Sequence, residues 1–82
     1  MQSDVFQVRL KSLRIAKSMT LQRLGEQIGM SRGSLSAVEN GRRPISLDSL
    51  IAIADALETS VDYLVGRTDD PTRPPPPQPK SD

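Results

Sequence analysis

The sequence predicts an all-α domain of five short helices, and three observations lead to this prediction. Apolar residues recur at helical spacing in five segments of the chain. A serine or threonine stands directly before four of these segments, where its side chain can cap the start of a helix. None of the segments alternates apolar and polar residues in the way that a half-buried strand does.

The first two helices follow from their apolar spacing and from the residues at their ends. We expect the first helix to run from Asp4 to Lys17, and the second to begin after Thr20. Gly29 ends the second helix, because glycine adopts the left-handed conformation of a helix C-terminus without a steric penalty from Cβ.

The third helix begins after Ser31 and stops at Asn40-Gly41. A loop then leads to Ser46, which caps a fourth helix from Leu47 to Leu57. The apolar residues of this fourth helix form a broad face that we expect to pack inward: Leu47, Leu50, Ile51, Ile53, Ala54 and Leu57.

Ser60 caps a short fifth helix, which we expect from Val61 to Val65. From Arg67 onward the chain is polar and rich in proline, ending in TDDPTRPPPPQPKSD. Such a composition cannot bury enough apolar surface to offset the entropy of ordering it. We therefore expect a folded domain over residues 1–66 and a disordered tail or linker over residues 67–82.

The composition excludes several classes of function. The chain has no cysteine and no histidine, so a zinc site built from thiolates or imidazoles is excluded, as is a cysteine or histidine nucleophile. It also has no glycine-rich phosphate loop and no pair of carboxylates in a plausible cleft, so we expect neither an enzyme nor a bound metal or cofactor. No apolar run reaches the length of about 18–20 residues that a membrane span requires. The first ten residues contain no basic segment followed by an apolar stretch, so we expect no secretory signal.

The charges are unevenly distributed, although the formal net charge is only +1. Residues 9–43 carry eight lysines and arginines against two glutamates, which leaves +6 on that segment. Residues 44–66 carry only acidic charges, four in all. The basic half of the molecule is therefore the one that would meet phosphate groups.

The segment from Thr20 to Gly41 predicts a helix-turn-helix. Two short helices that meet at a steep angle need a glycine in the turn, which is Gly29, and a small residue where the second helix crosses the first, which is Gly25. They also need apolar residues around the turn and one helical turn to either side. These are Leu24, Ile28, Met30, Leu35 and Val38.

Residues 6–66 resemble the phage-repressor helix-turn-helix family, also called the Cro/CI or XRE type. The likeness rests on S-x-x-x-L-S-x-x-E-N-G-R-R-P, which follows the turn, and on SLDSLIAIADALETSVDYLVG, which completes the domain. The resemblance implies a compact five-helix, lambda-repressor-like domain whose second and third helices form the motif. It also implies that the third helix enters the major groove of double-stranded DNA.

Carried over residue by residue, the resemblance implies a set of DNA contacts. The candidates for reading bases are Arg32, Gly33, Ser34, Ser36 and Ala37. The candidates for contacting phosphates are Lys17, Thr20, Gln22, Arg23, Ser31, Asn40, Arg42 and Arg43. Arg32 is the best base reader, because a guanidinium can bind O6 and N7 of guanine in two parallel hydrogen bonds. The family also implies a structural ion pair between Arg14 and Glu39.

This chain departs from the family at two places. Leu21 stands where relatives often have a glutamine that contacts a phosphate, and the third helix carries short side chains where many relatives have longer polar ones. We therefore expect that helix to read few bases directly, with DNA shape or bridging water contributing to recognition.

The resemblance implies a sequence-specific transcriptional regulator, a repressor that binds a pseudo-palindromic operator as a homodimer through the region of the fifth helix. We expect this bacterial or phage-encoded protein to act on the nucleoid in the bacterial cytoplasm. We expect no association with a membrane. A second interpretation stays open. The chain could be a DNA-binding antitoxin or a protein-interaction module whose tail, or whose face formed by the fourth and fifth helices, binds a partner protein.

Overall fold

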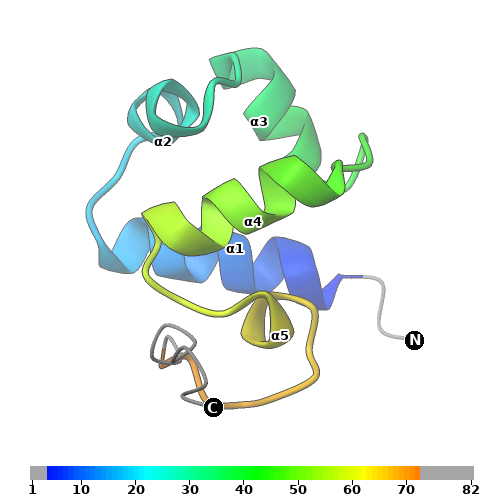
Figure 1. The fold of residues 1–82 in the computed structure, drawn as a ribbon. Helices are drawn as coiled ribbons and strands as arrows, with labels where there is room; N and C mark the ends of the chain where they lie inside the picture. The colour runs from blue at the N-terminus through cyan, green and yellow to red at the C-terminus, as the bar shows by residue number, and fades with distance from the viewer. Residues whose placement is uncertain (1–3, 73–82) are drawn as a thin grey trace, which may run out of the picture.

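The structure is a computed structural model that describes residues 4–72, and the all-α prediction is confirmed within that range. No strand occurs there (Figure 1). The five helices are α1 (Val5–Ala16), α2 (Leu21–Ile28), α3 (Arg32–Glu39), α4 (Leu47–Ala56) and α5 (Val61–Leu64). None of them is long and apolar enough to cross a lipid bilayer.

Local capping explains why the predicted and observed helix ends agree so closely. The hydroxyl groups before four helices each accept a hydrogen bond of 3.0–3.1 Å from the backbone N–H three residues later. These hydroxyls belong to Thr20, Ser31, Ser46 and Ser60. Such a bond satisfies one of the backbone donors that a helix N-terminus leaves unpaired. The start of each of these helices is therefore determined by residues next to one another in the chain.

The core takes at least one fully buried side chain from every helix. Its members are Leu10, Leu24, Leu35, Val38, Ile53, Ala54, Leu57 and Leu64. In Figure 1, α2 and α3 lie at one end of the molecule and α5 lies at the other, with α1 and α4 between them. The helix-turn-helix pair thus stands at one end of a small shared core.

The expected inward face of α4 is wrong at two positions. Leu47 is 67% exposed and Ile51 is 43% exposed, although Ile53, two residues further along and on the other side of the helix, is fully buried. The helix packs against α2 and α5, and these neighbours cover only part of its apolar surface. Leu47 and Ile51 lie four residues apart, so they form one exposed apolar strip on α4.

The crossing of α2 and α3 depends on two glycines. Gly29 ends α2 at φ +74°, in the left-handed region that glycine enters at no steric cost. Gly25 is buried, and a Cβ placed on it would overlap the carbonyl oxygen of Met30. The turn between α2 and α3 is closed by a 2.8 Å hydrogen bond from the backbone N–H of Met30 to the carbonyl oxygen of Gly25. The turn therefore lies too close to α2 for any side chain at position 25.

We expect Gly25→Ala to lower the free energy of unfolding by about 1–3 kcal/mol, because the turn backbone must move away from the added methyl group. The matched control is Gly33→Ala on α3, where an added Cβ meets no atom within 4 Å. Alanine at that helical position should raise the free energy of unfolding by about 0.5–1 kcal/mol. Urea titrations followed by circular dichroism measure both values. Equal effects of the two variants would contradict the close crossing.

The structure describes the first six residues of the expected tail or linker, as far as Thr72. Residues 67–72, which we call the C-terminal strap, turn back toward α1 and α5. Nη1 of Arg9 donates to the carbonyl oxygens of Tyr63 and Thr68, each over 2.6 Å. The hydroxyl of buried Thr59 donates to the carbonyl oxygen of Pro71 over 2.7 Å.

The strap is therefore held by hydrogen bonds to its backbone and by a 2.9 Å ion pair between Nη2 of Arg9 and the carboxylate of Asp69, rather than by burial of its own side chains. The guanidinium of Arg9 also lies 4.1 Å from the centre of the Tyr63 ring, in cation–π contact. The composition of a segment indicates whether it can bury apolar surface. It does not predict that a distant arginine will bind the carbonyl groups of that segment. Residues 73–82 of the expected tail lie outside the described residues.

Candidate nucleic-acid interface

The two sides of α3 have different roles. Leu35 and Val38 are buried in the core, and Glu39 is buried beside them. The base-reading candidates lie on the remaining surface of the helix: Arg32 and Gly33 are exposed, and Ser34, Ser36 and Ala37 are half-buried. The core therefore holds α3 by one side and leaves the other side open to solvent.

An open hollow beside α3 brings three predicted DNA-binding residues together. Arg32 lies there with Thr20 and Gln22 from the start of α2, and Arg14 and Leu21 complete the lining. The Thr20 hydroxyl caps α2 by accepting from the backbone N–H of Arg23 over 3.0 Å. The remaining amide groups of the helix N-terminus carry a partial positive charge, which favours an anionic group at this place.

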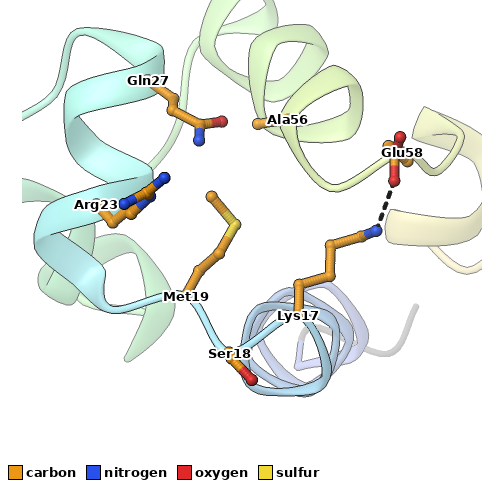
Figure 2. Close-up of a pocket in the computed structure, with 7 residues that line it drawn as sticks. All are labelled: Lys17, Ser18, Met19, Arg23, Gln27, Ala56 and Glu58. Atoms are coloured by element: carbon orange, nitrogen blue, oxygen red, sulfur yellow. Dashed lines mark hydrogen bonds and ion pairs between the residues drawn. The ribbon is translucent and has the colours of Figure 1, made fainter.

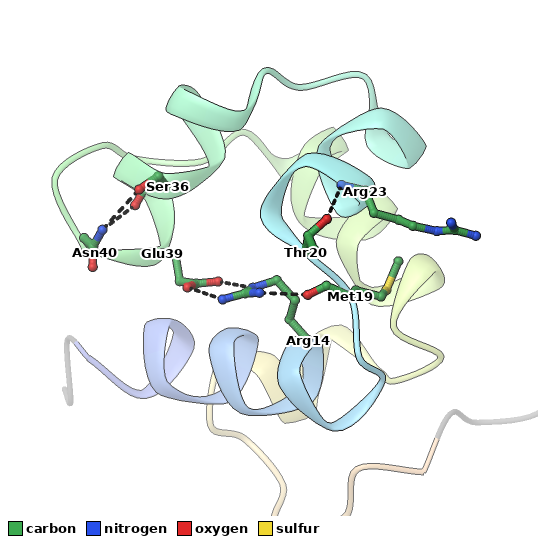
Figure 3. A network of polar contacts seen from close by, with 7 residues as sticks. All are labelled: Arg14, Met19, Thr20, Arg23, Ser36, Glu39 and Asn40. Carbon is green, nitrogen blue, oxygen red and sulfur yellow. Dashed lines mark hydrogen bonds and ion pairs between the residues drawn. The ribbon is translucent and has the colours of Figure 1, made fainter.

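Two further candidates contact each other at the other end of α3. The side-chain amide of Asn40 donates to the carbonyl oxygen of Ser36 over 2.9 Å and to its hydroxyl over 3.4 Å (Figure 3). The side chain of Asn40, just past the end of α3, is therefore held against the last turn of the helix. The Ser31 hydroxyl is used as the α3 cap, accepting from the backbone N–H of Ser34 over 3.1 Å.

Arg42 and Arg43 follow α3 in the loop that leads to α4, and both are exposed. Nη1 of Arg43 donates to the hydroxyl of Ser34 over 2.8 Å. Sequence reasoning missed this contact, because periodicity predicts helices and does not predict how a loop folds back on one. The only signal in the sequence is an arginine placed shortly after a helix with short, polar side chains.

The structure does not bring Lys17 and Arg23 to the surface that carries Arg32. Both line a separate hollow together with Ser18, Met19, Gln27, Ala56 and Glu58 (Figure 2). Nζ of Lys17 forms a 2.7 Å ion pair with the carboxylate of Glu58. The side chain of Arg23 extends from α2 on the side away from Asn40 and Ser36 (Figure 3).

The ion pair between Arg14 and Glu39 is present and connects α1 to α3. Nε of Arg14 donates to one carboxylate oxygen over 2.8 Å, and Nη2 donates to the other over 3.0 Å. Nη1 donates to the carbonyl oxygen of Met19 over 2.8 Å, so one guanidinium holds α1, α3 and the segment before α2 (Figure 3). The hydrogen bond to Glu39 raises the pKa of Arg14 above its ordinary value, against the opposing effect of burial. The arginine therefore stays charged at any pH at which the protein is handled.

We expect Arg14→Met to lower the free energy of unfolding by about 3–5 kcal/mol, because the carboxylate of Glu39 is left buried without its partner. The double variant Arg14→Met with Glu39→Met removes both charges and should cost much less than the sum of the two single substitutions. A double-mutant cycle measured by urea unfolding gives the coupling. A coupling near zero would show that the pair does not brace the two helices.

The comparison with known proteins agrees with this geometry. The sequence profile of the helix-turn-helix family matches residues 10–64, which include the core residues of every helix. The chain belongs to the helix-turn-helix family. No solved structure matches the chain.

Three curated relatives illustrate the range of this family. An uncharacterised HTH-type transcriptional regulator of Bacillus subtilis, YobD, is 40% identical over 77% of this chain and 56% of its own length. The cryptic phage CTXphi transcriptional repressor RstR of Vibrio cholerae is 39% identical over 72% of this chain and 53% of its own length. The HTH-type transcriptional regulator AnsR of Bacillus subtilis is 36% identical over 72% and 51%. The chain thus spans about half the length of these relatives, which are named as regulators and not as enzymes.

Proposed function

We propose that this protein is a sequence-specific DNA-binding transcriptional regulator that represses by occupying a pseudo-palindromic operator as a homodimer. Its family and the names of its relatives support regulation, and the phage repressor among them supports repression. A protein bound to the operator would block access of RNA polymerase to a promoter. This binding would take place on the nucleoid, in the cytoplasm.

One observation carries the proposal: α3 is anchored in the core by Leu35 and Val38 while its other side, with Arg32, stands open beside the start of α2. In the helix-turn-helix docking mode the second helix enters the major groove and the first crosses the backbone. Arg32 can then reach a guanine edge. Thr20, Gln22 and the amide groups of α2 can meet a phosphate, as can Asn40, Arg42 and Ser31 at the ends of α3.

Selection of bound duplexes from random DNA tests this function directly. We expect a preferred half-site that contains guanine, repeated in inverted orientation with centres about 34–36 Å apart if two copies bind side by side on one face of the duplex. Arg32→Ala should weaken binding to the selected site by about 1–3 kcal/mol and change binding to unrelated DNA much less. Titrations at fixed salt measure both affinities. An equal loss on every duplex would contradict base reading by Arg32.

The homodimer is proposed to form through the α5 region. One helix reads only a few base pairs, so a useful preference for one operator requires two linked copies. Val65 at the end of α5 is 41% exposed, which leaves apolar surface there for a second copy to bury. Tyr63 on the same helix is covered on one ring face by Arg9, so the interface would use the side of α5 away from that contact.

We expect Val65→Lys to raise the dimer dissociation constant at least tenfold, because the two-fold axis would bring two desolvated charges together. Ile15→Lys on α1 is the matched control. That residue is 57% exposed, and like Val65 it lies at the end of a helix, where a lysine suits the helix dipole. Sedimentation equilibrium without DNA measures the association. Dissociation by the control and not by Val65→Lys would place the interface elsewhere.

A protein-interaction module, including an antitoxin, is the second candidate function. The exposed strip formed by Leu47 and Ile51 on α4 favours it, because exposed apolar surface between acidic residues suits a protein partner better than DNA. Random-DNA selection separates the regulator from an interaction module that does not bind DNA, and a pull-down with and without residues 67–82 tests for the protein partner that a DNA-binding antitoxin requires. A purified protein that selects no sequence and binds no duplex at low salt would leave only the second.

A further inference from the structure

We propose that Arg43 is a second base-reading arginine, and that Ser34 is the residue that positions it. This inference rests on the proposed DNA-binding function and changes the role of one residue within it. The sequence placed Arg43 with the phosphate contacts because it lies in the loop past α3. The structure instead holds its guanidinium against the hydroxyl of Ser34, over 2.8 Å, in the first turn of α3.

Helix geometry places the two arginines on opposite edges of the recognition surface. Each residue advances an α-helix by about 100°, so Arg32 and Ser34 point to either side of the strip that contains Gly33 and Ala37. Arg32 lies on the edge beside the start of α2. Arg43 reaches the opposite edge through its bond to Ser34. Two guanidiniums thus flank a strip that bears no long side chain.

The small residues between them allow a close approach to DNA. Gly33 has no side chain, and even an added Cβ there would meet no protein atom within 4 Å. Ala37 and Ser36 add only short side chains. A helix that can lie deep in the groove brings groups on both of its edges within reach of the bases. Arg43 can therefore reach a base edge and is not limited to the phosphates of the DNA backbone.

The chemistry of the two partners gives each a separate task. A serine hydroxyl both donates and accepts hydrogen bonds, so by itself it discriminates poorly between bases. A guanidinium has five N–H donors in a fixed planar arrangement, and one of them is used on Ser34. The remaining donors can bind O6 and N7 of guanine together. Ser34 restricts the orientation of the guanidinium before DNA arrives, which lowers the entropic cost of that contact.

Arg43→Lys is the decisive variant, because it keeps the positive charge and loses the planar pair of donors. In a selection from random DNA, the wild-type protein should prefer guanine at two positions of each half-site. Arg43→Lys should lose the preference at one of them by roughly 10- to 100-fold while keeping the other. Its salt dependence of binding should not change, because the number of charges near phosphates is the same.

Two further variants separate positioning from other effects. Ser34→Ala removes the acceptor and should weaken the preference at the same position as Arg43→Lys, with little added effect in the double variant. Arg67→Lys is the matched control, because this exposed arginine lies in the C-terminal strap past α5 and is not among the candidates for DNA contact. It should leave both preferences intact. Thermal unfolding of each variant verifies that the fold is unchanged.

The outcomes distinguish this inference from the proposed function. If the wild-type protein selects no sequence, the proposed function itself fails. If it selects a site and Arg43→Lys leaves every base preference as it was, or weakens all duplexes equally, Arg43 contacts only phosphate and the inference is overturned. A Ser34→Ala effect at a different base pair from that of Arg43→Lys would show that Ser34 reads DNA by itself.

Discussion

The close crossing of α2 and α3 is the constraint on which the exposed surface depends. The carbonyl oxygen of Met30 occupies the space that a Cβ at Gly25 would need, and the backbone N–H of Met30 binds the carbonyl oxygen of Gly25. This contact fixes the start of α3 against the middle of α2. Leu24 and Leu35 can then share one core while Arg32 stays outside it, next to the N-terminus of α2. A wider crossing would separate the residues that a single DNA backbone and groove must meet together.

A second contact, remote in sequence, keeps this pair of helices in place on the rest of the domain. Arg14 binds Glu39 at the end of α3 and the carbonyl oxygen of Met19 before α2, so both ends of the motif are tied to α1. With only 8 residues in each motif helix, neither could keep its orientation by its own hydrogen bonds. The orientation of the recognition surface therefore comes from the core on one side and from a buried charge pair on the other.

The sequence predicted what local chemistry determines and failed where distant neighbours decide. Helix starts follow from a hydroxyl and an N–H three residues apart, so they were correct to within a residue. The exposure of Leu47 depends on whether another element covers α4, and the contacts of the strap, which the sequence analysis did not address, depend on Arg9, more than fifty residues away. The bond from Arg43 to Ser34 depends on a loop path that no apolar spacing encodes. The DNA contacts themselves stay predictions, since they were carried over from a family resemblance.

Because the side chains of α3 are short, most of the proposed base recognition must come from residues at the edges of the helix. A strip of glycine, alanine and serine offers good fit to a groove but few distinctive hydrogen bonds, so the discriminating groups must stand at its edges. In the proposed function, the basic half of the chain meets the phosphates of any duplex, with an affinity that falls steeply as salt rises. In the proposed homodimer, preference for one site comes from a small number of well-held arginines in each of the two copies. In such a protein a guanidinium held in one orientation contributes more to binding specificity than a flexible one, because only a few contacts distinguish an operator from other genomic DNA.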